Sequence, residues 1–376
     1  MKEFLSYIDT SIGRIFERIH TNTWVDTQAL AYFRIFFGIF MLSHYLPQWQ
    51  WFGSAPQAFF NPHMFTMTGF MDGFLPQWFY ILLDLANILF FCLLTLGVRT
   101  RISLAFLFLI NFFGYSSEFS FGKIDHEVHL YLIALLTLIF TNCGTKSALV
   151  KDKVLKTDVQ KWAISLLSIY IAFGFFSAGI PKFLRWVDFD INEIGILDWF
   201  FKGFYTYDRT HLLAESVFKT PYWVFEFLDY LAPTLEILGF AFLLWSKRAW
   251  RVYIIIFSCF HMGNMLILNI EFALNITCYG IFLIAPFLSY IRKYLPQGKN
   301  AKSLLITVVG ALGIYQIWSV FHNLDRVYEL GYFSDKFHTE TYMSVLVWLI
   351  TVFIGIFVLW KKLYEKQEEI NPIKIV

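Results

Sequence analysis

Charged residues are scarce in this sequence. Asp, Glu, Lys and Arg make up 15% of its 376 residues, whereas about a quarter of a typical soluble domain is charged. So little charge argues against a disordered chain and against a nucleic-acid-binding protein. The net charge of +2 likewise indicates no acidic partner.

Cysteine is equally scarce. The chain has four cysteines, and none lies in a CxxC pair or at metal-ligand spacing. This excludes a disulfide-rich secreted module. We predict that all four are packed thiols in apolar surroundings: Cys92, Cys143, Cys259 and Cys278.

Apolar residues dominate instead, at 57% of the chain, with 45 Phe. A membrane-spanning helix needs about 20 mostly apolar residues, and such runs are too long and continuous for barrel strands. The fourth run is short, and only residues 269–271 separate the seventh from the eighth. We therefore predict an all-α, polytopic transmembrane bundle of nine or ten helices from these runs: 28–47, 79–98, 102–119, 128–142, 158–179, 221–245, 250–270, 272–291, 303–322 and 341–361.

Residues 1–27 combine charged and apolar side chains at helical spacing. No cleavable signal peptide is visible in them. We predict an amphipathic helix that lies on the membrane surface.

Lys and Arg are distributed unequally between the two sets of loops. One set, which includes both termini, holds 20 of the 30 basic residues, and the other holds 8. Since cytoplasmic loops of membrane proteins are enriched in Lys and Arg, both termini are expected in the cytoplasm. The loops 48–78, 115–127, 180–220 and 323–340 are then expected outside.

Two of these outer loops are long and aromatic. The loop 48–78 has no Lys or Arg, and 180–220 contains several Trp, Phe and Tyr residues. We expect 48–78 to be interfacial or re-entrant and 180–220 to fold back against the helix ends. Such loops would cover a site that opens to the outside or to the outer leaflet.

Ionisable residues inside predicted spans are energetically costly and therefore informative. Arg34 lies near the inner end of the first span, where its side chain is expected to reach the cytoplasmic interface. Asp84 and Glu236 lie deeper in their spans. Each of these two carboxylates needs a partner inside the bundle.

The densest group of ionisable residues lies where an outer loop leads into the fourth span. Lys123, His126 and His129 share approximately one helical face. A lysine in low-dielectric surroundings loses its proton more readily and can act as a general base. The alternative is an ordinary polar helix start with Asp125 as N-cap, and the residues alone slightly favour it. The two histidines lack the HExxH spacing of zinc sites, so we predict no metal.

A second polar group lies in the seventh span. His261 and Asn264 are one turn apart, and Asn269, Glu271 and Asn275 continue the polar residues toward the outer side. We predict that His261 and Asn264 line a polar pocket in the outer half of the bundle, with Glu236 as their acidic partner.

Together these segments resemble the membrane (HTTM) domain of the vitamin K-dependent gamma-glutamyl carboxylase superfamily. The resemblance covers roughly residues 25–295 and depends on the order and spacing of dispersed motifs. The motifs that carry the resemblance are Ala31 to Gly38 with Arg34, the turn Leu96 to Ser103, Lys123 with His129 and Tyr131-Leu132, Ala178 to Lys182 with Trp186, and Phe260-His261 with Asn264.

The resemblance implies that Lys123 is the base that deprotonates a vitamin K-type hydroquinone such as menaquinol. The loop charges independently place Lys123 at the outer face, where the carboxylase has its lumenal active site. We expect a catalytic set of Lys123, His129, His261 and Asn264, and a substrate-binding set of Lys182, Glu236 and His126. The domains are then the interfacial helix 1–27, the HTTM domain 28–295, and two further spans with a short cytoplasmic tail in 296–376.

The chain also departs from the carboxylase. Gly122 replaces an acidic residue before the lysine, and Glu236 replaces an aligned Asp. The large lumenal domain that grips the protein substrate is missing, so a small or lipid-soluble substrate, such as a quinone, is expected. A non-catalytic membrane subunit that partners another protein remains an alternative. A transporter is a weaker one, because no internal repeat is visible.

Overall fold

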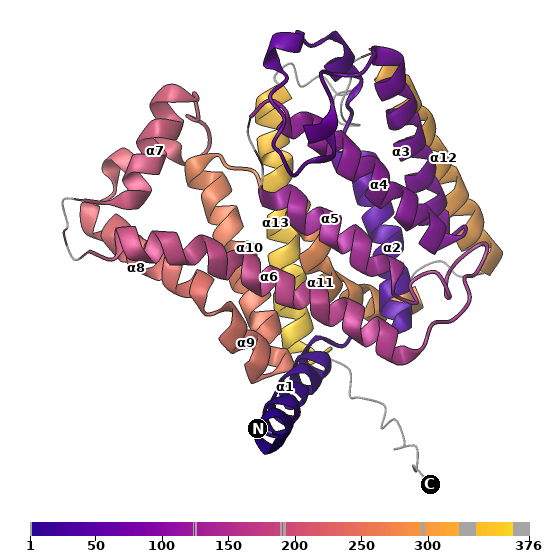
Figure 1. The fold of residues 1–376 in the computed structure, drawn as a ribbon, viewed down its shortest axis with the longest axis horizontal. Coiled ribbons are helices and arrows are strands. Elements are labelled where there is room, and N and C mark those ends of the chain that lie inside the picture. Colours follow the sequence, from indigo (N-terminus) through magenta and orange to yellow (C-terminus); the bar gives the residue numbers. More distant parts are fainter. Residues whose placement is uncertain are drawn as a thin grey trace.

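The structure is a computed structural model that describes residues 2–122, 124, 126–188, 190, 193–294, 298–322 and 336–363. Every regular element in this part of the chain is a helix, and its only bridge between extended segments joins Val98 and Val150. The predicted all-α helical bundle is confirmed (Figure 1).

The described residues contain eight segments that are long and apolar enough to cross a membrane, so the chain is an integral multi-pass membrane protein. A bent pair of helices, α8 (Tyr222–Ile237) and α9 (Gly239–Trp245), can serve as a ninth span, and α5 (His126–Ile139) is a shorter apolar helix. These ten elements match the ten predicted runs. The eight segments are Thr27–Ser54, which begins with α2 (Thr27–Phe40); α3 (Gln77–Leu96); α4 (Thr100–Phe119); α6 (Thr157–Trp186); α10 (Lys247–Leu268); Ala273–Tyr294, which contains α11 (Ile276–Ile291); α12 (Gly298–His322); and Tyr342–Trp360 of α13 (Lys336–Trp360).

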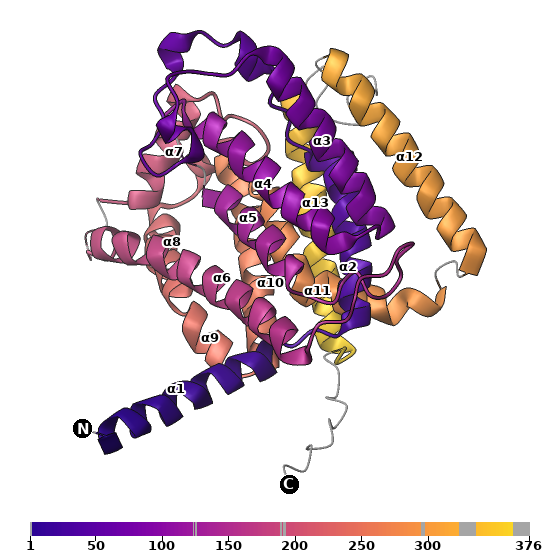
Figure 2. The same cartoon turned by 45° about the vertical axis from the view of Figure 1, so that its right-hand side comes forward.

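The spans differ in how far they are enclosed. The segment that contains α11 is the most buried of the eight, whereas α12 is the least buried. Figures 1 and 2 show α12 at the edge of the bundle beside α3. The helices that enclose α11 therefore surround the best-protected part of the molecule.

The N-terminal segment forms α1 (Lys2–Thr23), as predicted, and it is attached by its C-terminal end. Asn22 Nδ2 donates to the Leu243 carbonyl (2.8 Å), and His20 Nδ1 lies 2.6 Å from Ser165 Oγ. The other end of α1 projects from the bundle (Figure 2). Ile12 and Ile15 are exposed on the helix, and its position on the membrane surface stays a prediction.

Arg34 differs from expectation. Its guanidinium is fully buried and donates to the Ser147 carbonyl (2.5 Å) and to Thr100 Oγ1 (3.3 Å). The loop after α5 folds over this end of α2 and supplies the carbonyl acceptor. The prediction that Arg34 reaches the membrane interface is therefore wrong, because its guanidinium is buried and two of its nitrogens donate to protein oxygens instead of water.

One of the four cysteines also differs from expectation. Cys143 and Cys278 are buried and Cys92 is partly buried, but Cys259 is exposed. The prediction of a packed thiol is therefore wrong at Cys259, which is exposed on α10.

Asp84 of α3 is satisfied by backbone groups. Its carboxylate accepts from Trp49 N (2.9 and 3.1 Å) and Gln50 N (2.9 Å), at the first turn of the short helix Gln50–Ser54. This anchors the start of the loop 48–78. Further along, Thr68 Oγ1 donates to the Ser116 carbonyl (2.8 Å), so the loop is fastened to the end of α4.

The loop 180–220 contains α7 (Gly195–Thr206) and the short helix Ala214–Lys219, and these two helices together with α8 form what we call the arm. Figure 1 shows the arm projecting to one side, where it packs on α6 and α10. Asp229 of α8 accepts from Gly195 N (2.6 Å) and Ile196 N (2.9 Å) and so caps α7. The arm has a small apolar core of its own: Ile194, Leu197, Phe200, Ala214, Val217 and Phe225.

Candidate functional site

Lys182 and Glu236 form an ion pair between α6 and α8. The Glu236 side chain is 3% exposed and the Lys182 side chain is 27% exposed. The two helices approach closely at Gly179, where an added Cβ would lie 2.8 Å from Glu236 Cβ. Glycine at this position thus brings the amine and the carboxylate within contact.

Pro233 and Gly239 shape the helix pair that carries Glu236. Proline cannot donate to the carbonyl one turn earlier and weakens α8 before its end. Gly239 begins α9 and leaves room for Tyr253, whose hydroxyl would lie 2.8 Å from an added Cβ. The resulting bend between α8 and α9 is 49°, and Glu236 lies just before it.

His261 lies on α10, where its side chain is 4% exposed. Its Nε2 is 2.9 Å from the hydroxyl of Tyr279 on α11. Aromatic rings surround it, with centroids 4.6 Å away for Phe272, 5.3 Å for Trp348 and 5.9 Å for Phe175. The imidazole is thus enclosed by aromatic rings and bonded to one phenol.

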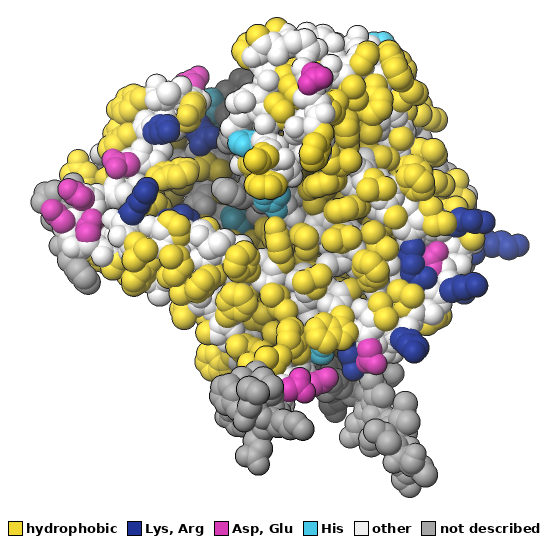
Figure 3. All heavy atoms as spheres, in the orientation of Figure 1, with side chains coloured by type: hydrophobic (Ala, Val, Ile, Leu, Met, Phe, Trp, Pro, Cys, Tyr) yellow, Lys and Arg dark blue, Asp and Glu magenta, His cyan; other side chains and the backbone are white. Residues whose placement is uncertain are grey.

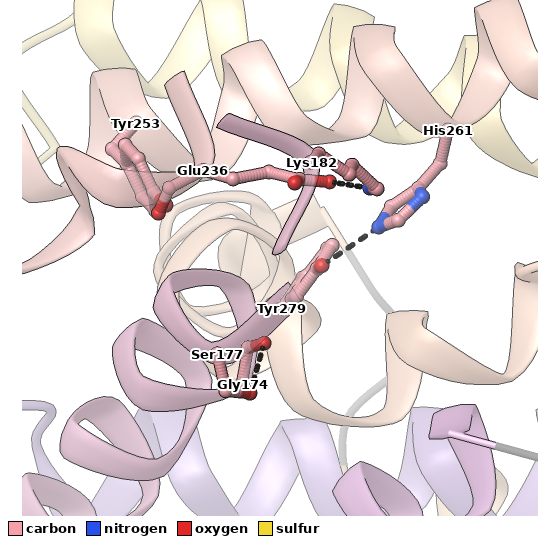
Figure 4. Close-up of polar contacts among 7 residues, drawn as sticks. All are labelled: Gly174, Ser177, Lys182, Glu236, Tyr253, His261 and Tyr279. Atoms are coloured by element: carbon pink, nitrogen blue, oxygen red, sulfur yellow. Dashed lines mark hydrogen bonds and ion pairs between the residues drawn. The ribbon is translucent and has the colours of Figure 1, made fainter. Parts of the chain in front are cut away.

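Figure 4 shows the side chains of Lys182, Glu236 and His261 converging. Tyr253 Oη donates to the Glu236 backbone carbonyl (3.5 Å). We call these residues, with Tyr279, the Lys182 cluster. It combines an amine, a carboxylate, an imidazole and two phenols, which are the groups that move protons in enzymes.

Two buried atoms of the Lys182 cluster have no hydrogen-bond partner among the described residues: Glu236 Oε2 and His261 Nδ1. An unsatisfied buried polar group costs roughly 1–3 kcal/mol. A bound molecule that pairs with these atoms would remove this cost.

The structure brings together part of the predicted pocket. His261 and Glu236 both point into the Lys182 cluster, but the partner of Glu236 is Lys182, and that of His261 is Tyr279. Asn264 is half-buried one turn after His261, and its carbonyl accepts the cap N–H of Asn269. No hydrogen bond joins the Asn264 side chain to the cluster within the described residues.

The predicted group around the start of α5 is described only in part. Lys123 lies outside the described residues, and of His126 only its place as the first residue of α5 is described. His129 is half-buried, and its ring lies edge-on to Phe119 at 6.0 Å. The positions of these residues relative to the Lys182 cluster stay predictions.

Three residues of this region were missed from the sequence: Tyr253, Tyr279 and Trp348. All three are fully buried. A buried Tyr or Trp needs a partner for its polar atom, but in a chain with 20 Tyr and 13 Trp this signal does not single out particular positions.

The molecular surface is hollowed between the arm and the body that contains α4 and α5 (Figure 3). His side chains are visible within the hollow, and Lys and Arg side chains lie on the arm beside it. In the described part of the chain, no three His, Cys, Asp or Glu residues are grouped so that they could hold a metal ion.

The model of the HTTM domain family matches residues 22–286. The chain belongs to the HTTM domain family. The match confirms the resemblance found in the sequence, and it includes every residue of the Lys182 cluster. The helices α12 and α13 of this HTTM protein lie beyond the matched segment. No curated protein and no solved structure matches the chain.

Proposed function

We propose that this HTTM protein is a membrane enzyme in which a lysine acts as general base on a lipid-soluble hydroquinone. The observation that carries the proposal is the partly buried Lys182–Glu236 pair beside His261, with unpartnered atoms on both Glu236 and His261. By the loop charges, the site opens toward the outer side of the membrane.

Lys182 is the better-supported base in this proposal. Keeping two opposite charges in a low-dielectric site carries a large desolvation penalty. A proton that moves from Lys182 Nζ to the contacting Glu236 carboxylate leaves both groups neutral. The free amine can then accept a proton, and Glu236 stores the first one. From the sequence, Lys182 is only a substrate-binding candidate, while Lys123 remains the base that the family resemblance implies.

The residues fit a hydroquinone. Glu236 Oε2 can accept from a hydroxyl, and His261 Nδ1 can bind a hydroxyl as donor or acceptor. The rings of Phe175, Phe272 and Trp348 around His261 suit an aromatic ligand. A bound hydroquinone would supply the reducing electrons for reaction with oxygen.

The test measures consumption of menaquinol-4 in oxygenated buffer by the purified protein in lipid nanodiscs. Lys182→Arg and Lys182→Ala should each lower the rate about 100-fold or more, because a guanidinium stays protonated and alanine has no base. Lys202→Arg, at an exposed position on α7, is the matched control and should leave the rate unchanged.

Lys123→Arg distinguishes the two candidate bases. If Lys123→Arg abolishes the rate and Lys182→Arg does not, Lys123 is the base. Full activity in both variants would exclude both Lys123 and Lys182 as the base. If the wild-type protein consumes no menaquinol-4 and purifies with a stoichiometric protein partner, it is a non-catalytic membrane subunit.

A further inference from the structure

The helix α13 lies outside the segment matched by the family, yet it packs directly against the candidate site. Ser344 is fully buried, and its hydroxyl donates to the carboxylate of Glu271. Three turns further along, Gly355 approaches α10 and α11 so closely that an added Cβ would lie 2.6 Å from Ile255 and 3.3 Å from Leu283. Contacts at both ends of this stretch thus fix α13 beside α10 and α11.

Trp348 lies on α13 between these two contacts and is 0% exposed. Its ring centroid is 5.3 Å from that of His261 and 5.9 Å from that of Tyr279. Since His261 and Tyr279 are hydrogen-bonded to each other, the three rings form one packed group. Trp348 thereby belongs to the surroundings of the Lys182 cluster, although it is distant from it in sequence.

The indole nitrogen of Trp348 is buried and has no hydrogen-bond partner among the described residues. An indole N–H can only donate, so its partner must be an acceptor. The Trp348 side chain is fully buried, so bulk water does not contact this nitrogen. His261 Nδ1, in the adjoining ring, is the second unpartnered nitrogen of the group.

We propose that Trp348 is a ligand-binding residue of this HTTM protein and donates its indole N–H to an oxygen of the bound molecule. The ligand class is an aromatic ring that carries a carbonyl or hydroxyl oxygen, which the ring of Trp348 packs against and its N–H binds. The inference rests on the proposed function and adds that a helix beyond the family segment completes the site.

The test compares two probes that differ only in oxygen: 2-methyl-1,4-naphthoquinone and 2-methylnaphthalene. Their dissociation constants are measured by thermal stabilisation of the purified full chain. The wild-type protein should prefer the quinone. Trp348→Phe should bind the quinone about five- to tenfold more weakly, as expected for one lost hydrogen bond, and should bind 2-methylnaphthalene as before.

Two controls accompany this variant. Trp360→Phe alters an exposed tryptophan of the same helix and should behave as the wild type. If Trp348→Phe fails to fold, β-(3-benzothienyl)alanine at position 348 replaces it, because this residue has the shape of tryptophan without the N–H.

The outcomes separate the two proposals. If the wild type shows no preference for the quinone, both the quinone site and the role of Trp348 are overturned. If the wild type prefers the quinone and the variant without the indole N–H keeps that preference, Trp348 is not a ligand donor, and the proposed function stands.

Discussion

Lys182 and Glu236 are ion-paired across two helices whose backbones meet at Gly179. The pair is asymmetric, because the carboxylate is almost fully buried while the amine keeps partial access to its surroundings. Removal of either charge therefore leaves the other in a different environment. Because of this asymmetry, the two single substitutions should change protein stability by different amounts, and this difference can be measured without an activity assay.

We predict that Lys182→Met destabilises the protein more than Glu236→Gln. Lys182→Met leaves the almost fully buried Glu236 side chain without its partner, and the loss of one partner of a buried pair costs on the order of 3 kcal/mol. Glu236→Gln leaves a lysine that can turn toward solvent, so its effect should be smaller. Thermal unfolding of the purified protein in detergent measures both effects.

The pair Lys161–Asp158 on α6 provides the control, with 3.6 Å between Nζ and Oδ1 and a carboxylate side chain that is 80% exposed. Lys161→Met should change the unfolding free energy by less than about 0.5 kcal/mol, because an exposed pair is weak. Equal losses for Lys161→Met and Lys182→Met would show that burial does not strengthen the Lys182–Glu236 pair.

We predict that Asp84→Ala destabilises the protein by about 2–4 kcal/mol. Two buried N–H groups, of Trp49 and Gln50, lose their acceptor, and each costs roughly 1–3 kcal/mol when unsatisfied. The loop 48–78 should also become accessible to protease. Asp72→Ala in the same loop is the control, since Asp72 is exposed. A variant at Asp84 as stable as the wild type would mean that the loop is held by its other contacts alone.

The helical bundle could be predicted because lipid and backbone chemistry impose it. Apolar runs of about 20 residues have few alternatives to a spanning helix. The bend between α8 and α9 was harder to predict from the sequence. It depends on Pro233 together with the close packing of Gly239 on Tyr253. The sequence shows the proline and the glycine but does not show the residue that fills the space.

The candidate site was predicted less completely, because pairing between distant helices leaves no local pattern. His261 and Glu236 were recognised as polar residues that need partners. Their actual partners, Tyr279 and Lys182, are set by which helix faces meet. The prediction for Arg34 was wrong for the same reason. The sequence around Arg34 does not show that the distant Ser147 carbonyl accepts a hydrogen bond from its guanidinium.

We predict that attachment of α1 weakens in mild acid. Burial lowers the pKa of His20 below its ordinary value of 6.5, so the docked helix favours the neutral imidazole. The docked state binds fewer protons than the undocked state. Its stabilisation by His20 is therefore complete above pH 6.5 and declines as the pH falls below it. Hydrogen exchange of α1, corrected for intrinsic rates, should show the loss.

His20→Phe provides the control for this prediction. It keeps an aromatic ring against Trp162, whose centroid is 4.6 Å from that of His20, but removes the titrating group. The nearby charges of Glu17, Lys161 and Asp158 remain in place. If the acid sensitivity persists in His20→Phe, these other charges cause it and not the histidine.

We predict that the Lys182 cluster opens toward the outside of the cell or into a lumen. The exposed lysines of the loop after α5 should stay in the cytoplasm under the positive-inside rule. Reporter fusions after Lys153 and Lys299 should therefore report cytoplasm, and fusions within 190–215 should report the exterior. Fusions that keep the chain intact up to each junction preserve the preceding spans. An external signal after Lys153 would invert the topology and make the cluster accessible from the cytoplasm instead.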